Sequence, residues 1–251
     1  MDYIYSTWPY IIKEDVLNVP RHFVIGSHPT KLPFNRGRHP LHWLISMGIP
    51  ESYVSFFIMD KGIDSGNILI QERYSCEYNY GIQDVYENMM QAYKTAIRKT
   101  CALLEKNPDY PGTRQNEDLV NYWRKRNIFD LIIDFRMRAL DIERLVKSFN
   151  RPYECAVLLH KEEMIRIQNA QVIDYAGMDA QLERLEPGRV IWIKEGCIAV
   201  KTADKIVRLD VDENTNMLEM QFGRYIYPSM KYITENTVLY QKLLPFAEIA
   251  K

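Results

Sequence analysis

The stretch that decides the fold is Ile25-Gly-Ser-His-Pro-Thr-Lys-Leu-Pro-Phe-Asn-Arg-Gly-Arg-His-Pro-Leu-His-Trp43. It begins at the end of a short apolar run, residues 22–26, which predicts a buried strand. Its prolines and glycine then predict an irregular loop. A second stretch, Met59-Asp-Lys-Gly-Ile-Asp-Ser-Gly-Asn-Ile-Leu69, predicts a turn at Asp60–Gly66 between two β-type runs. The sequence therefore predicts a hairpin, and a polar loop at the end of each of two strands.

Outward from these stretches the pattern predicts two domains. Runs of β-type residues predict strands at residues 2–13, 53–59 and 67–72. Helices are predicted at residues 41–47, 82–106 and 139–149. Beyond residue 150, short β-type runs alternate with turn signals at 155–160, 164–173, 190–193, 198–200, 205–211 and 217–222. We therefore expect an α/β domain over residues 1–149 with connector helices, and a β-rich domain over residues 150–251.

Composition indicates an ordinary globular protein. The 251 residues are 47% hydrophobic and 26% charged, with a net charge of -1, so no overall charge favours nucleic acid. The longest apolar runs fall far short of the ~20 residues of a membrane helix, and residues 1–8 lack the pattern of a secretory signal. The four cysteines are widely spaced and form no CxxC pair. We expect a cytoplasmic protein with reduced thiols, no disulfide and no metal site.

The two stretches resemble the signature motifs of the folate-dependent formyltransferases. The family pattern reads roughly N-x-H-P-S-x-L-P-x-x-R-G, then D-x-G-x-D-x-G-x-I. Trp8-Pro-Tyr-Ile-Ile12 upstream and Tyr122-Trp-Arg-Lys-Arg126 downstream also fit, so the resemblance runs from about residue 2 to about residue 210. The family includes methionyl-tRNA, glycinamide ribonucleotide and sugar N-formyltransferases. The resemblance implies a partial Rossmann-like α/β core followed by a small, mainly β (OB-like) C-terminal domain.

The resemblance also implies the chemistry. An amine attacks the formyl carbon of 10-formyltetrahydrofolate, which creates a negative oxygen and a positive nitrogen. The enzyme must donate a hydrogen bond to the oxygen and remove a proton from the nitrogen. His28 is the expected donor, and Asp64 is the expected proton acceptor, through a water. The alternatives are that His28 is an ordinary hydrogen-bonding loop residue and that Asp60 and Asp64 are turn formers.

Folate and substrate contacts are expected on the same loops. The resemblance implies that the pterin lies between two segments, whose residues are Tyr10, Ile11, Ile12, Met59, Asp60, Lys61, Gly62 and Ile63. Residues 16–50 contain no Asp or Glu but four basic residues, which favours an anionic substrate. The expected substrate contacts are Thr30, Lys31, Arg36 and Arg38. The alternative is a solvated basic loop.

The acceptor is expected to be a small amine, nucleotide-linked and phosphate-bearing. The Arg36-Gly-Arg-His-Pro-Leu-His-Trp43 segment looks more like the sugar N-formyltransferases than like the tRNA enzyme. Residues 151–251 hold 13 Lys and Arg against 15 Asp and Glu, whereas a tRNA-binding domain would be expected to be basic. Methionyl-tRNA formyltransferase-like activity is therefore the alternative. No membrane is expected as a partner, and a homo-oligomer is possible.

Two departures from the family pattern favour a different class of function. Gly26 stands where the family has an asparagine whose amide helps to hold the formyl oxygen. The sequence also begins close to the strand before Trp8, so the usual N-terminal nucleotide-binding half is expected to be lacking. The competing hypothesis is a non-catalytic homologue that binds folate or a sugar nucleotide, or an inactive fragment.

Overall fold

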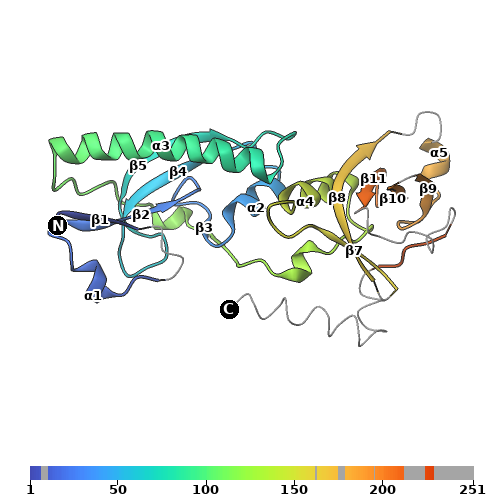
Figure 1. Cartoon of the computed structure of the whole chain (residues 1–251), viewed down its shortest axis with the longest axis horizontal. Coiled ribbons are helices and arrows are strands. Elements are labelled where there is room, and N and C mark those ends of the chain that lie inside the picture. Colours follow the sequence, from blue (N-terminus) through green and yellow to red (C-terminus); the bar gives the residue numbers. More distant parts are fainter. Residues whose placement is uncertain (7–10, 162, 175–178, 195, 212–223, 229–251) are drawn as a thin grey trace. The chain divides into compact units, whose positions relative to one another are not determined.

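The computed structural model describes residues 1–6, 11–161, 163–174, 179–194, 196–211 and 224–228. Its internal contacts divide the chain into two compact units. The first unit comprises Met1–Leu44 and Gly48–Lys125, and the second comprises Ile45–Met47 and Arg126–Lys251. Figure 1 shows the elements of both units along the chain.

The first unit is built on a four-stranded sheet in the order β1-β2-β4-β5. The strands are β1 (Tyr3–Ser6), β2 (Phe23–His28), β4 (Glu51–Ile58) and β5 (Ile68–Ser75). β1 pairs with β2 in parallel, whereas β2–β4 and β4–β5 are antiparallel. The antiparallel β4–β5 pair confirms the predicted hairpin, and the mixed α/β character of the unit is confirmed with it.

The long helix α3 (Ile82–Lys106) lies along one face of this sheet, against β4 and β5 (Figure 1). Its buried residues recur every three or four positions, as an amphipathic helix requires. They are Ile82, Val85, Met89, Ala92, Ala96, Thr100 and Leu104. The predicted helix over residues 82–106 is confirmed.

Short elements complete the first unit. They are α1 (Glu14–Leu17), β3 (Arg36–Gly37), α2 (Pro40–Ser46), whose last two residues fall in the second unit, η1 (Glu117–Leu119) and β6 (Tyr122–Trp123). β3 and β6 form a two-stranded parallel pair that joins Arg36 to Tyr122 and Gly37 to Trp123. This pairing brings the loop after β2 together with a segment about 85 residues later in the chain.

The second unit is mainly β, as predicted. Its five-stranded antiparallel sheet has the order β7-β8-β11-β10-β9. The elements are η2 (Ile128–Leu131), α4 (Ala139–Ser148), β7 (Val157–His160), β8 (Glu163–Ile173), α5 (Asp179–Leu182), β9 (Val190–Lys194), β10 (Cys197–Lys201) and β11 (Ile206–Val211). The predicted run at 217–222 lies outside the described residues.

Helix α4 belongs to the second unit, although the sequence placed it before the domain boundary at residue 149. Ile142, Leu145 and Val146 are at most 4% exposed and lie in one apolar cluster with residues of β7, β8 and β11. The units therefore divide after Lys125 instead of near residue 150, because the apolar face of α4 is buried against the β-rich sheet. No helix among the described residues is long and apolar enough to cross a membrane.

Candidate active site

β2 ends at His28, and the side chain of His28 points away from α3. The Ser27 hydroxyl accepts a hydrogen bond from Tyr93 of α3 at 3.2 Å, so Ser27 faces the helix. Successive side chains of a strand point to opposite faces. His28 and Gly26 therefore lie on the face of the sheet that α3 does not cover.

The loop after His28 is fixed to the neighbouring strands by buried hydrogen bonds. The Ser55 hydroxyl donates to the Thr30 carbonyl at 2.6 Å and accepts from the Leu32 N–H at 3.2 Å. The Gln71 side-chain amide donates to the Leu32 carbonyl at 3.0 Å. Thr30 is fully buried and its own hydroxyl donates to the Phe34 carbonyl at 2.8 Å. Thr30 thus has its side chain inside the loop, where it shapes the backbone.

The structure brings His28 and Asp64 together. His28 Nδ1 lies 3.4 Å from Asp64 Oδ2, and the two side chains are 6% and 19% exposed. His28 Nε2 lies 2.8 Å from the Asn35 carbonyl oxygen. A carbonyl oxygen only accepts, so Nε2 carries a proton, and this bond fixes the ring with Nδ1 toward Asp64. The contact at Nδ1 is long, which leaves this nitrogen able to bond to a third group.

Asp64 is held from the opposite side by Gly37. The Gly37 N–H donates to Asp64 Oδ2 at 2.9 Å, so the same carboxylate oxygen faces both His28 and a backbone donor. Gly37 has φ +106, and a Cβ here would lie 2.5 Å from the Trp123 carbonyl oxygen. Only glycine fits this conformation and this approach without strain. The Arg-Gly sequence of the loop therefore shapes the Asp64 environment through the glycine backbone.

Arg36, expected from the sequence to contact the substrate, is 1% exposed and is bonded inside the protein. Its guanidinium donates to both Glu117 carboxylate oxygens, at 2.9 and 3.3 Å, and to the Tyr122 hydroxyl at 3.1 Å. Burial alone would lower the pKa of this guanidinium, but hydrogen bonds and the charge of Glu117 raise it. It also donates to Gln115, which the sequence did not single out. Gln115 follows the proline- and glycine-containing connector after α3, where no motif marked it.

Lys31 and Arg38 are the basic residues of this loop whose side chains are exposed. The Lys31 ammonium lies 4.9 Å from the centre of the Tyr53 ring. The Arg38 backbone N–H donates to the Trp123 carbonyl at 3.1 Å, which extends the β3–β6 pairing. These two cations are therefore placed on the surface of the same loop that carries His28.

The two segments expected to hold folate lie near each other. Tyr10 falls outside the described residues. Ile11 is 72% exposed, Ile12 is half-buried, and both line a pocket of about 380 Å³ together with Ile4, Ser6, Lys13, Asp15 and Val16. An ion pair of 2.9 Å joins Lys61 to Glu14. Glu14 lies in the sequence between Lys13 and Asp15, which line this pocket. His28 and Asp64 do not line the pocket.

The second segment expected to hold folate is a turn closed by its own side chains. Asp60 Oδ1 accepts from the Gly62 N–H at 2.9 Å and from the Ser65 hydroxyl at 2.6 Å. The Met59 N–H donates to the Val24 carbonyl at 2.8 Å, which ties the turn to β2. Ile63 is 49% exposed and therefore presents apolar surface on this turn. Asp60 is accordingly engaged in shaping the turn that carries Asp64.

At Gly26 a side chain would fit only if the side chains of Phe57 and Met59 shifted. A Cβ at this residue would lie 2.8 Å from both Met59 Cγ and Phe57 Cζ. An asparagine amide would extend further still, so the two apolar side chains take the space that the family residue would need. At Gly26, Phe57 and Met59 thus pack close to the backbone, and the glycine itself offers no side-chain donor.

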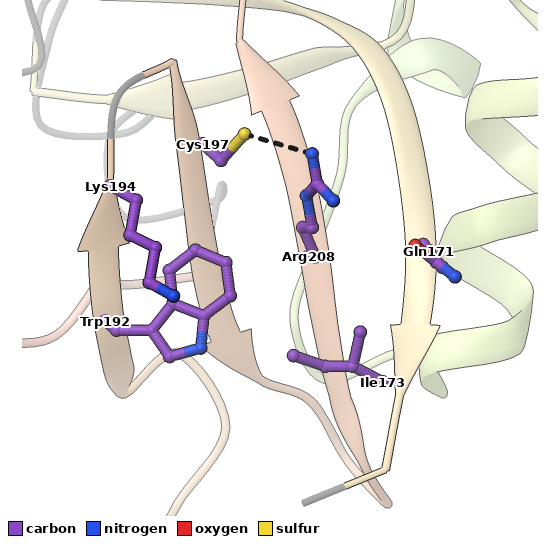
Figure 2. Close-up of a pocket in the computed structure, with 6 residues that line it drawn as sticks. All are labelled: Gln171, Ile173, Trp192, Lys194, Cys197 and Arg208. Carbon is purple, nitrogen blue, oxygen red and sulfur yellow. Dashed lines mark hydrogen bonds between the residues drawn. The ribbon is translucent and has the colours of Figure 1, made fainter.

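A separate pocket of about 530 Å³ lies in the second unit (Figure 2). It is lined by side chains of the strands β8 to β11, namely Gln171, Ile173, Trp192, Lys194, Cys197 and Arg208. The Arg208 guanidinium donates to Cys197 Sγ at 3.4 Å, the bond drawn in the figure. Within the part of the chain that is described, no group of His, Cys, Asp and Glu could hold a metal ion.

Two family models match this chain. Residues 3–100 match the family description "Formyl transferase", and residues 129–221 match "Formyl transferase, C-terminal domain". Methionyl-tRNA formyltransferase of Clostridioides difficile (strain 630) is 24% identical over 216 residues, which are 86% of this chain and 67% of that protein. The chain spans about two thirds of the length of the curated relatives it matches.

Solved structures show the same fold. HypX from Aquifex aeolicus in complex with tetrahydrofolic acid has a TM-score of 0.63 at 16% identity, over 83% of this chain and 35% of that one. An N-formyltransferase from Helicobacter canadensis, in complex with folinic acid and dTDP-3-aminofucose, has a TM-score of 0.63 at 18% identity, over 83% and 73%. Because both family domains match in order and together span most of its length, the chain belongs to the folate-dependent formyltransferase family.

Proposed function

We propose that this chain moves a formyl group from 10-formyltetrahydrofolate to the amine of a phosphate-bearing small molecule, namely a nucleotide-linked amino sugar. The observation that carries this proposal is the His28–Asp64 pair, nearly buried, with Nδ1 and Oδ2 3.4 Å apart. A histidine and a carboxylate so placed are the acid–base groups that formyl transfer needs. His28 ends strand β2, and Asp64 lies in the turn between β4 and β5.

Each member of the pair has a distinct task. The folate supplies the formyl carbon bonded to N10. The new bond joins the acceptor nitrogen to that carbon, the bond to N10 breaks, and one proton passes from the amine to N10. In its imidazolium form His28 donates Nε2–H to the Asn35 carbonyl, which holds the ring, and Nδ1–H to the developing negative oxygen. Asp64, the more exposed partner, accepts the amine proton directly or through a water.

The pocket beside α1 supports folate binding. Ile4, Ile11, Ile12 and Val16 give it apolar walls, and a flat heteroaromatic ring suits such walls when backbone groups supply the polar contacts. The turn with Met59, Asp60, Lys61, Gly62 and Ile63 is the second part of the proposed site. Lys61 reaches Glu14 at 2.9 Å, which supports a site assembled from both segments.

We propose that Lys31 and Arg38 contact the phosphate groups of the acceptor. Arg36 and Thr30 have buried, bonded side chains, so their proposed role is to shape the loop. A nucleotide-linked amino sugar is favoured because residues 151–251 carry a net charge of -2, whereas tRNA needs basic surface. The curated relatives, which are methionyl-tRNA formyltransferases, favour tRNA as the second candidate acceptor.

The packing at Gly26 favours one further candidate, a homologue that binds folate without turning it over. Removal of one oxyanion donor costs about 10²–10³ in kcat in other enzymes, and here Phe57 and Met59 fill the space of the donor. A slow transferase and a non-catalytic binder should respond differently when an asparagine is restored at residue 26. Gly26→Asn together with Phe57→Leu and Met59→Ala should raise the turnover of a slow transferase about 10²-fold or more. A non-catalytic binder should stay at zero turnover.

Turnover with 10-formyltetrahydrofolate tests the proposal directly. The acceptor panel contains dTDP- and UDP-linked amino sugars, the free amino sugars, and methionyl-tRNA. We expect formylated product with a nucleotide-linked amino sugar and less product with the free amino sugar. In the double variant Lys31→Ala/Arg38→Ala, the two acceptors should give similar amounts of product. Asp2→Ala serves as the control, because its ion pair with Arg21 is exposed. Formylation of methionyl-tRNA alone would contradict the proposed acceptor.

A further inference from the structure

Gln115 lies in the first unit, 4% exposed, between α3 and η1. Its amide nitrogen donates to two carbonyl oxygens, that of Asp64 at 2.8 Å and that of Gly66 at 2.7 Å. Its amide oxygen accepts from Arg36 Nε at 3.2 Å and from Arg36 Nη2 at 2.8 Å. An arginine only donates, so the oxygen must face Arg36 and the nitrogen must face the carbonyls. All four bonding positions of the amide are therefore used, and its orientation is fixed.

Arg36 is itself held rigidly. The guanidinium bonds to both Glu117 carboxylate oxygens and to the Tyr122 hydroxyl, and Arg36 pairs with Tyr122 in the β3–β6 ladder. A planar fork bound by two acceptors at once has little freedom to rotate. Gln115 is thus attached to a group whose place is set by backbone pairing and by an ion pair together.

The backbone that Gln115 holds needs such support. Asp64 has φ +53, a left-handed conformation that residues with a Cβ adopt rarely. The carbonyls of Asp64 and Gly66 both turn toward the one amide nitrogen. With the backbone in this conformation, the Asp64 carboxylate meets the Gly37 N–H at 2.9 Å and His28 Nδ1 at 3.4 Å. The side chain of Arg36 and the backbone of Gly37 therefore fix the same aspartate from two directions.

We propose that Gln115 is a positioning residue for formyl transfer. Its hydrogen bonds to the carbonyl oxygens of Asp64 and Gly66 set the distance between Asp64 and His28. This inference rests on the proposed function. Gln115 touches neither reacting group, so its effect passes through the backbone of Asp64. Loss of its two N–H donors allows the turn at residues 64–66 to relax, and the carboxylate moves away from Nδ1. A misplacement of about 1 Å can lower a rate about 10²-fold.

The variant Gln115→Glu separates positioning from folding. Glutamate keeps the shape of the side chain and the acceptor for Arg36, but it replaces both N–H donors with an oxygen that repels the two carbonyls. We expect kcat to fall 10- to 100-fold, with KM for the folate changed less than about 3-fold. Val85→Ala is the matched control, since Val85 is fully buried on α3 outside both loops. It should lower stability and leave kcat within about 2-fold.

A second measurement does not depend on turnover. The ring ¹⁵N signals of His28 respond to the neighbouring carboxylate, and they can be recorded with or without folate. We expect them to shift in Gln115→Glu and to stay in place in Val85→Ala. Unchanged His28 signals in Gln115→Glu would overturn the inference, as would an equal loss of kcat in Val85→Ala. If the wild-type chain formylates no acceptor while the His28 signals shift as expected, the proposed function fails and the positioning of Asp64 stands.

Discussion

The two units bury polar side chains in different places. In the first unit, His28, Thr30, Arg36, Ser55 and Gln115 are at most 5% exposed, and their bonds join the segments after β2 and β4 to one another and to residues 115–122. In the second unit, the apolar cluster runs from Ile128 to Ile226, and the buried carboxylate of Glu143 bonds to its own helix and to β8.

This difference separates the expected effects of substitutions. A polar residue of the first unit fixes the position of a loop, so its loss should lower activity more than stability. A buried residue of the second unit holds helix α4 and the sheet together, so its loss should lower the free energy of unfolding. Three predictions, in order of decreasing effect, test whether this division holds.

Leu158→Ala should cause the largest loss of stability. Leu158 is 1% exposed in β7 and belongs to the main apolar cluster. Removing a buried leucine side chain costs about 2–5 kcal/mol, because apolar contacts are lost and a cavity remains. Urea unfolding measures the loss, with Arg166→Ala, exposed on the neighbouring strand β8, as the control. If both variants unfolded at the same urea concentration, the cluster would not be the source of stability.

Glu143→Ala should have the next largest effect and tests one of the buried polar residues of the second unit. Glu143 Oε1 accepts from Lys147 Nζ at 2.6 Å, and Oε2 accepts from the Val172 N–H at 2.8 Å. Its loss leaves the part-buried Val172 N–H on β8 without this partner, at a cost of about 2 kcal/mol. Asp174→Ala is the control, since its pair with Lys205 is exposed and should contribute less than about 1 kcal/mol. Equal unfolding energies for the two variants would show that α4 is not anchored through Glu143.

The smallest effect, about 1.4 kcal/mol, should be the part of the alkaline loss of stability that Tyr93 contributes between pH 10 and 11, and it sharpens the comparison within the first unit. Burial raises the pKa of Tyr93 from 10.0 to about 12 and that of Cys76 from 9.0 to about 12. Both groups stay protonated in the folded chain while the unfolded chain loses its protons. The Cys76 contribution to stability is therefore full below about pH 9 and the Tyr93 contribution below about pH 10, and each falls by about 1.4 kcal/mol per pH unit up to about pH 12.

Urea unfolding between pH 8 and 11 measures this slope. Tyr93→Phe removes one contribution, whereas Cys101→Ser, at an exposed position of the same helix, should leave the slope unchanged. A slope that is the same in Tyr93→Phe and in the wild-type chain would mean that Tyr93 ionises freely in the folded state. The hydroxyl groups on the α3 side of the sheet would then not be part of its packed core.

Local patterns were enough to predict most elements. The predicted hairpin is β4–β5, and the helical spacing from Ile82 to Lys106 gave the bounds of α3, because each depends on neighbours in the sequence. The motifs also identified His28 and Asp64, which the fold brings together. The long-range pairing of Arg36 with Gln115 and Tyr122 could not be predicted. It depends on contacts across about 80 residues, and an arginine in a loop has the same sequence pattern whether it is buried or solvated.

The measurement closest to the central claim is a double-mutant cycle on His28 and Asp64. We expect His28→Asn and Asp64→Asn each to lower kcat for formyl transfer at least ~100-fold, because each removes an acid–base or oxyanion group. The double variant should be hardly slower than either single variant, since the two residues act as one unit. Folate affinity should change little in all three. Near-wild-type turnover in either single variant, or fully additive losses in the double variant, would contradict the account.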